Sequence, residues 1–261
     1  MLLRVGPFAI YWYGVLIAVG FVVAVRLLLG LVEREGIDPD QTLSAALVAA
    51  LFGLLAARLG YVLTNQPGYY LDPKHIGEML SLSTAGLSFV GGIAGGVFGA
   101  WLYASRNSLP LARLLDLGAV AAPLGQLVGR IGNVINGDER GLLTDRFGVE
   151  YTNPRNPFVA TDRFARTMQP LALYQFAWDV VLFALLIAIY RRARLRPGQL
   201  AGLYLLGYGV GDVVISAFSA APGLLFSLKT GQVLGLVVAA AGLAVFLYQR
   251  SATTSTAAAA A

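Results

Sequence analysis

Long apolar runs separated by short polar connections make up most of this chain. Each run has about 20 residues, which is the length of helix that crosses a bilayer. The pattern therefore predicts an all-α polytopic membrane protein with about seven transmembrane helices. We expect these at residues 8–32, 43–63, 87–103, 111–131, 170–190, 200–218 and 232–248.

One long polar stretch, residues 133–169, separates the fourth apolar run from the fifth. Residues 147–151 alternate like a short β-strand, and the Asn-Pro pairs that follow are turn signals. We expect a small irregular extracytoplasmic cap here, with a little β-structure. The predicted parts are spans one to four at 1–132, the cap at 133–169, spans five to seven at 170–250 and a disordered tail at 251–261.

Composition supports the membrane assignment and excludes several kinds of chemistry. Apolar residues make up 57% of the chain and charged residues only 13%, against roughly a quarter in soluble domains. The net charge of +5 is too scattered for a nucleic-acid surface but suits anionic lipid headgroups. With no cysteine and a single histidine, His75, thiolate and His-pair metal sites are excluded. We predict neither a metal nor a cofactor, and membrane lipid rather than nucleic acid as partner.

The orientation follows from the positive charges in the short connections. Arg106 and Arg113 follow the third run, four arginines lie within 191–196, and Arg250 follows the seventh run. In a seven-span protein these connections share one side, and loops rich in Lys and Arg stay in the cytoplasm. We expect the N-terminus outside and the C-terminus in the cytoplasm, with the cap on the outer face.

Polar residues inside apolar runs are costly and therefore candidates for function. Arg58 either reaches the nearby interface or serves a site. Asp179 and Asp212 lie inside apolar runs, where a carboxylate needs a partner. Each belongs either to a structural ion pair with a cation or to a functional site. The glycines at 86–99, Gly91 and Gly92 among them, permit close helix packing or close approach of a lipid headgroup. Residues 207–212 superficially resemble a potassium-channel filter, which leaves a small transporter or channel as an alternative.

The most informative segment is GRIGNVINGDERG at residues 129–141. It places the guanidinium of Arg130 and the carboxamides of Asn133 and Asn136 on one helical face at the outer end of the fourth span. Arginine pairs with phosphate through two parallel hydrogen bonds and stays charged. The segment predicts a lipid-phosphate site, with an arginine-capped helix end followed by an Asn turn as the alternative.

Six ordered blocks of the sequence are similar to the prolipoprotein diacylglyceryl transferase family, over nearly the whole chain. The most specific is GRIGNVING at 129–137, followed by Gly141. The others are VGPFAIYWYG at 5–14, RLGYV at 58–62, GLSFVGG at 86–92, PLALY at 170–174 and LGYG at 206–209.

The resemblance implies a multi-pass enzyme of the bacterial inner membrane. Such an enzyme transfers the diacylglyceryl group of phosphatidylglycerol to the lipobox cysteine thiol of a preprolipoprotein signal peptide, and glycerol 1-phosphate leaves. Arg130 would bind the lipid phosphate. We assign catalysis to Arg130 and Tyr13, and substrate binding to Arg130, Asn133, Asn136, Gly141, Arg58, Gly91, Gly92 and Tyr208.

The chain departs from the family pattern at several positions. Val90 replaces a His or Tyr, and Asp212, Ser216 and Ser219 stand where the family usually has Arg, Glu and Arg. Either another arginine compensates, with Arg58, Arg140, Arg163 and Arg166 as candidates, or the chain is a phospholipid-binding paralogue. Such a paralogue uses another donor or acceptor, or is catalytically silent. A general base for the thiol cannot be chosen between Asp138 and Glu139.

Overall fold

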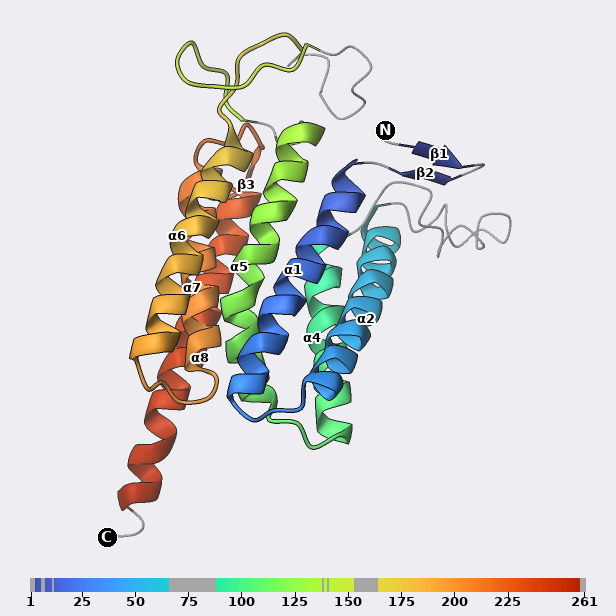
Figure 1. The fold of residues 1–261 in the computed structure, drawn as a ribbon. Helices are drawn as coiled ribbons and strands as arrows, with labels where there is room; N and C mark the ends of the chain where they lie inside the picture. The colour runs from blue at the N-terminus through green and yellow to red at the C-terminus, as the bar shows by residue number, and fades with distance from the viewer. Residues whose placement is uncertain are drawn as a thin grey trace. The chain divides into compact units, whose positions relative to one another are not determined.

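The computed structural model describes residues 3–5, 8–10, 12–65, 88–137, 139, 141–152 and 164–258 (Figure 1). Seven helices lie in these ranges, so the all-α polytopic class is confirmed. With the labels of Figure 1, they are α1 Trp12–Arg34, α2 Pro39–Asn65, α4 Phe89–Arg106, α5 Leu111–Asn136, α6 Leu171–Arg192, α7 Gln199–Ser216 and α8 Thr230–Ala258.

Six of the described helices are long and apolar enough to cross a membrane, namely α1, α2, α5, α6, α7 and α8. Helix α4 is the exception. It has 18 residues and five glycines in its first eleven positions, FVGGIAGGVFG, and glycine adds little hydropathy. The third predicted span is therefore a helix in the structure, but it is less apolar than its neighbours.

The helix boundaries differ most from the hydropathy pattern at the two ends of the chain. The first apolar run begins with the short strand β2 Phe8–Ile10, which pairs antiparallel with β1 Leu3–Val5, and α1 starts only at Trp12. At the other end, α8 continues to Ala258, well past residue 248. The added residues are Gln249, Arg250 and a run of Ser, Thr and Ala, and alanine has the highest helix propensity.

The helices fall into two compact units, which we describe separately. In the first unit, residues 1–10 and 29–114, helices α2 and α4 pack through glycine. A methyl group added at Gly91 would lie 2.4 Å from the carbonyl oxygen of Ala56, and one at Gly95 would lie 2.3 Å from that of Phe52. These glycines let the two backbones approach, which supports the packing interpretation of the glycine-rich run.

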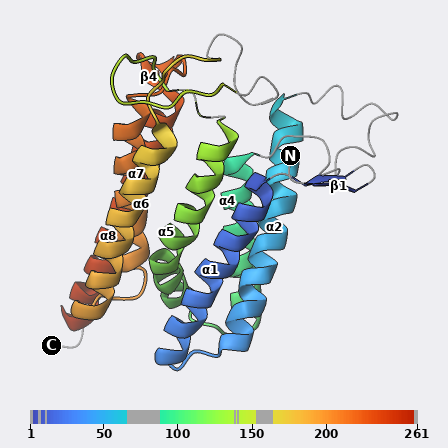
Figure 2. The ribbon, with the colours of Figure 1, turned by 45° about the horizontal axis from the view of Figure 1, so that its top comes forward.

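The second unit, residues 11–28 and 115–261, contains most of α1 and all of α6, α7 and α8 (Figure 2). Glycine again brings α7 and α8 together: a methyl group at Gly209 would lie 2.4 Å from the carbonyl oxygen of Gly235. Between α7 and α8, strands β3 Gly223–Leu225 and β4 Leu228–Lys229 form a hairpin. The Trp178 indole of α6 donates a hydrogen bond to the Gly207 carbonyl of α7, with a length of 3.0 Å.

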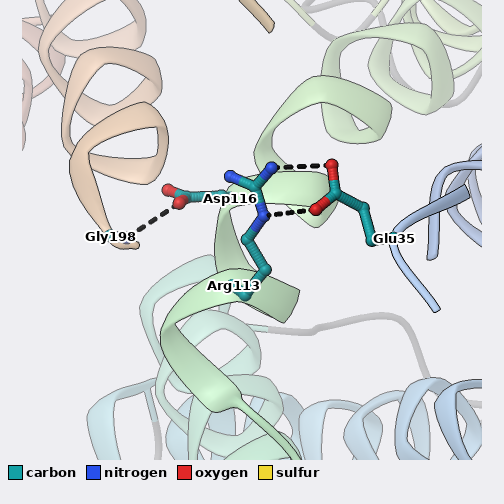
Figure 3. Close-up of polar contacts among 4 residues, drawn as sticks. All are labelled: Glu35, Arg113, Asp116 and Gly198. Carbon is teal, nitrogen blue, oxygen red and sulfur yellow. Dashed lines mark hydrogen bonds and ion pairs between the residues drawn. The ribbon is translucent and has the colours of Figure 1, made fainter. Parts of the chain in front are cut away.

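A buried aspartate on α5 caps the N-terminus of α7 (Figure 3). The carboxylate of Asp116, which is fully buried, accepts hydrogen bonds of 2.8 Å from the backbone N–H groups of Gly198 and Ala201. Gly198 has φ of +92°, a left-handed conformation that favours glycine. The Asp116 carboxylate thus supplies two of the hydrogen-bond acceptors that the N–H groups in the first turn of a helix lack. It ties α5 to α7 across more than 80 positions of sequence.

In the first unit, Arg113 and Glu35 form a bidentate ion pair (Figure 3). The Nη2–Oε1 and Nε–Oε2 distances are 2.7 and 3.1 Å. Both side chains are about a quarter exposed, so solvent screens the pair and its contribution to stability is about 1 kcal/mol or less.

Among the described residues between α5 and α6, the cap contains isolated β-bridges. Leu143 and Val149 each bridge to Met168, and Gly141 bridges to Ser219. Residues 147–151 were predicted as a short strand. In the structure they form a single β-bridge, between Val149 and Met168, because the segment around Met168 is not itself a strand. The Asn-Pro turns at 153–157 lie outside the described residues.

Candidate functional site

Arg130 lies near the end of α5 and is held by a carboxylate from α6. Its Nε donates a hydrogen bond of 3.3 Å to Oδ2 of Asp179. The Asp179 side chain is 2% exposed and that of Arg130 is 17% exposed, so the pair is largely desolvated. A buried charge requires such a partner, since removing one member leaves the other uncompensated. Asp179 therefore forms an ion pair, as one of its two interpretations predicted. Its partner is Arg130, the residue predicted to bind the lipid phosphate.

Three further polar side chains surround the same guanidinium. Oε1 of Glu139, at the start of the cap, lies 3.7 Å from Nη1 of Arg130. Tyr208 on α7 and Asp212, one turn further along α7, both interact with it electrostatically. Three helices and the cap thus converge on one arginine.

These contacts belong to a polar strip that runs along the helices of the second unit. Tyr204, Tyr208 and Asp212 are spaced by four on α7, which places them on one face. Opposite them on α5, Gln126 precedes Arg130 by one turn, and its side chain lies near Tyr204. The sequence did not reveal Gln126, Tyr204 or the contact between Glu139 and Arg130. The spacing of four residues on α5 and on α7 could have identified Gln126 and Tyr204.

Asn133 and Asn136 both lie on the last turns of α5, as predicted. The helix ends where Gly137, with φ of +71°, donates its backbone N–H to the Asn133 carbonyl at 2.8 Å. The ring of Tyr151 packs against Gly137, and its hydroxyl donates a 2.8 Å hydrogen bond to the Val134 carbonyl. The α5 terminus is thereby closed by backbone and by the cap, not by Arg130, whose side chain turns to Asp179. This excludes the helix-capping alternative for Arg130.

Tyr13 and Gly141 lie in the same unit as Arg130. The Tyr13 ring on α1 packs against Gly132, where an added methyl group would be 3.0 Å from its Cδ2. Gly141 is buried, and a methyl group there would be 2.0 Å from the Gln169 carbonyl oxygen. Tyr13 is thus brought to the α5 turn that carries the Arg130 segment, and Gly141 joins the cap to the chain before α6.

Arg58, Gly91 and Gly92 belong to the first unit. Arg58 is 1% exposed and lies over the ring of Tyr61, 5.6 Å from its centroid. Its side chain is therefore buried rather than extended to an interface, which corrects the snorkelling interpretation. Gly91 and Gly92 form the first turn of α4 and pack on α2.

The positions that depart from the family pattern have different surroundings. Asp212 faces Arg130, as described above. The hydroxyl of Ser216 packs against Gly231 at the α7–α8 contact, and Ser219 pairs with Gly141. Of the candidate compensating arginines, Arg166 is exposed on the cap. Arg140 and Arg163, Asp138 and the side chain of Val90 lie outside the described residues.

The channel analogy at residues 207–212 is wrong. These residues are part of the continuous helix α7, Gln199–Ser216, so their carbonyl groups bond within the helix and form no filter. Among the side chains that the structure describes, no group of three or more His, Asp or Glu residues is arranged to hold a metal ion.

The fold and the site define a polytopic helical membrane protein with a largely buried, carboxylate-held arginine where two spans meet a polar cap. The profile of the prolipoprotein diacylglyceryl transferase family matches residues 1–248. The phosphatidylglycerol--prolipoprotein diacylglyceryl transferases of Streptococcus pneumoniae strains JJA and Hungary19A-6 are 30% identical to the chain over 248 residues, or 95% of this chain and 92% of theirs. That of serotype 4 strain TIGR4 is 29% identical over the same length. The chain belongs to the prolipoprotein diacylglyceryl transferase family, a family of transferases.

Proposed function

We propose that the chain transfers the diacylglyceryl group of phosphatidylglycerol to the lipobox cysteine of a preprolipoprotein signal peptide. The cysteine sulfur attacks the glyceryl carbon that bears the phosphate. A C–S bond forms, the C–O bond to phosphate breaks, and glycerol 1-phosphate leaves with that electron pair. The thiol proton is released to solvent or to the leaving phosphate. The family membership and the Arg130 site together support this reaction.

Arg130 is the residue that carries the proposal, because a guanidinium stabilises the charge that gathers on the leaving phosphate. Its five N–H donors form a planar fork. Asp179 engages Nε from one side and fixes the fork in the helix bundle. The remaining edge can pair with phosphate oxygens. Tyr13 lies on the adjacent α1 surface, and we assign it, with Asn133, Asn136, Gly141 and Tyr208, to the lipid site.

We propose that the cap and the site beside it lie at one membrane surface. In our proposal the protein lies in the bacterial inner membrane with its N-terminus outside and its C-terminus in the cytoplasm. The cap then faces the outer side, where signal peptides of exported lipoproteins emerge. Arg58, Gly91 and Gly92 of the first unit are proposed to contact the lipid as well.

Substitution of Arg130 tests the proposal. Arg130→Ala should lower the rate of diacylglyceryl transfer to a lipobox peptide by about 100-fold or more, because an electrostatic partner of the transition state is lost. Arg130→Lys retains the charge beside Asp179 and preserves the fold, but it loses the fork geometry and should also be strongly impaired. Mass spectrometry of the peptide after incubation with phosphatidylglycerol measures the product.

Arg146→Ala is the matched control, since Arg146 is exposed on the cap. It should transfer at the rate of the unaltered protein, and thermal unfolding in detergent reports whether each variant is folded. Full transfer by a folded Arg130→Ala variant would remove Arg130 from the mechanism, and full transfer by Arg130→Lys would show that only its charge is needed.

One observation favours a second candidate function. Glu139, Asp179 and Asp212 all interact with Arg130, and carboxylates compete with phosphate for a guanidinium. A paralogue that binds phospholipid but uses another donor or acceptor, or is catalytically silent, fits this charge balance. It predicts that the unaltered protein binds phosphatidylglycerol in the same assay without modifying a lipobox peptide.

A further inference from the structure

The short segment that follows α7 is attached to the start of the cap. Residues 217–219 directly follow the helix. The Phe218 carbonyl accepts a hydrogen bond of 2.8 Å from the backbone N–H of Leu142, and Ser219 forms a β-bridge with Gly141. The first described stretch of the cap is therefore bonded through its backbone to the end of α7.

Lys229, just before α8, holds the same segment through its side chain. The ammonium group donates hydrogen bonds to the Ala217 carbonyl, at 2.7 Å, and to the Ser219 carbonyl. Three successive carbonyls after α7 thus have partners outside the segment, since Lys229 engages the first and the third and the cap engages the second. We refer to residues 141–142, 217–219 and Lys229 together as the α7–cap junction.

The position of Lys229 is set by the first turn of α8, which begins at Thr230. The backbone N–H of Lys229 donates a hydrogen bond of 3.0 Å to Oε1 of Gln232, as a glutamine at the third helical position does for the residue that precedes a helix. A cation is disfavoured at a helix N-terminus and favoured at a C-terminus. Because the ammonium group reaches the end of α7, its charge lies at the favourable terminus.

The α7–cap junction adjoins the lipid site proposed above. Gly141 belongs to both, and Glu139, two residues before it, has its carboxylate 3.7 Å from Nη1 of Arg130. Arg130 is held separately, by its hydrogen bond to Asp179 on α6. The junction therefore fixes the start of the cap near Arg130, whereas Asp179 fixes Arg130 itself.

We propose that Lys229 is a positioning residue for the lipid site: its ammonium group holds the end of α7 against the cap and so keeps Gly141 and Glu139 in place at Arg130. The inference rests on the proposed function, because it assigns a role in binding the donor lipid. Lys229 acts through the backbone of the junction and does not itself contact the reacting atoms.

This arrangement separates lipid binding from the chemical step. Without the ammonium group, the end of α7 loses two hydrogen bonds, and the start of the cap is less well fixed. Phosphatidylglycerol should then bind more weakly. Arg130 remains bonded to Asp179, so the rate of the bound complex should change little. A loss of folded protein has the opposite effect, since it lowers the apparent kcat and leaves KM unchanged.

Substitutions at Lys229 and at one control position test the proposal. Lys229→Met keeps an apolar stem and removes the N–H donors, whereas Lys229→Arg keeps a charged donor that can bond two carbonyls. Asn107→Ala is the matched control. The Asn107 side chain donates a hydrogen bond of 2.9 Å to the Tyr103 carbonyl at the end of α4, in the first unit. Its removal therefore costs the same kind of contact at another helix end.

Lys229→Met should raise the KM for phosphatidylglycerol about fivefold or more, a factor within reach of one hydrogen bond from a charged group. Its kcat should change by less than about twofold, and Lys229→Arg and Asn107→Ala should keep the KM of the unaltered chain. Lys229→Gln, which keeps two N–H donors without the charge, should be intermediate, and it provides the measurement if Lys229→Met does not fold. Transfer to a lipobox peptide at varied phosphatidylglycerol gives both constants, and thermal unfolding in detergent reports folding.

Three results would overturn the positioning role: an unchanged KM in the Lys229 variants that lack the charge, a loss confined to kcat, or an equal rise of KM in Asn107→Ala. Native mass spectrometry of bound phosphatidylglycerol on the same preparations lets the two hypotheses fail separately. Weaker binding by folded Lys229→Met, without transfer even by the unaltered chain, would support the role of Lys229 and reject the proposed reaction. Transfer with the same KM in every variant would support the reaction and reject the role of Lys229.

Discussion

At the scale of the residue, Gly141 shows how little space the cap leaves. A methyl group there would lie 2.0 Å from the Gln169 carbonyl oxygen, closer than any non-bonded pair of heavy atoms tolerates. Gly141→Ala should therefore displace the chain before α6, lower the thermal midpoint in detergent and reduce transfer at least 10-fold, by the large cost of an overpacked site.

Gly118→Ala on α5 is the comparison for this prediction. Among the described residues, an added methyl group at Gly118 meets no atom within 4 Å. The substitution should be neutral or stabilise the protein by up to about 1 kcal/mol, because alanine favours the helix. A Gly141→Ala variant as stable and active as Gly118→Ala would show that the cap does not require the close approach.

The sequence identified charged residues that lie in apolar runs. It did not identify residues whose importance comes from a contact with a residue far away in the sequence. Arg130 and Asp179 were found because charges are rare in apolar runs. Glu139 was left undecided, because its distance to Arg130 depends on how the chain turns after Gly137. The burial of Arg58 could not be predicted either, because an arginine that is buried and one that extends to the interface occur in the same sequence pattern.

At the scale of the element, the start of α7 depends on a side chain of α5. Asp116→Ala should destabilise the protein by about 2–4 kcal/mol, because the backbone N–H groups of Gly198 and Ala201 lose a buried charged acceptor. Asp116→Asn keeps one acceptor oxygen and should cost about half as much. Thermal unfolding in detergent orders the three proteins. Equal thermal midpoints for Asp116→Ala and the unaltered chain would contradict a stabilising role for the Asp116 hydrogen bonds.

Most helices were predictable because about 20 consecutive apolar residues have few other stable states in a bilayer. The start of α1 was not, since Phe8–Ile10 is apolar but pairs with Leu3–Val5 as a strand. The capping of α7 could not be predicted either. Its aspartate lies on α5, and no local pattern links position 116 to position 198.

At the scale of the whole molecule, the absence of cysteine makes the orientation directly testable. The 22 residues of α6 separate the cap from the α6–α7 connection, so the proposed topology places the two on opposite sides of the membrane. In intact spheroplasts, Asp145→Cys should react with a membrane-impermeant maleimide, whereas Arg194→Cys should react only after lysis. Both positions are exposed. The reverse labelling pattern would invert the proposed orientation.

The short helix α7 has a consequence for the surrounding lipid. It has 18 residues, or about 27 Å at about 1.5 Å per residue. The hydrocarbon core of a bilayer is about 30 Å thick. A span of this length favours a bilayer that is thinner beside it, and the cost grows with the mismatch. The acyl-chain length of the host membrane therefore contributes to the stability of this protein, independently of the headgroups that its site binds.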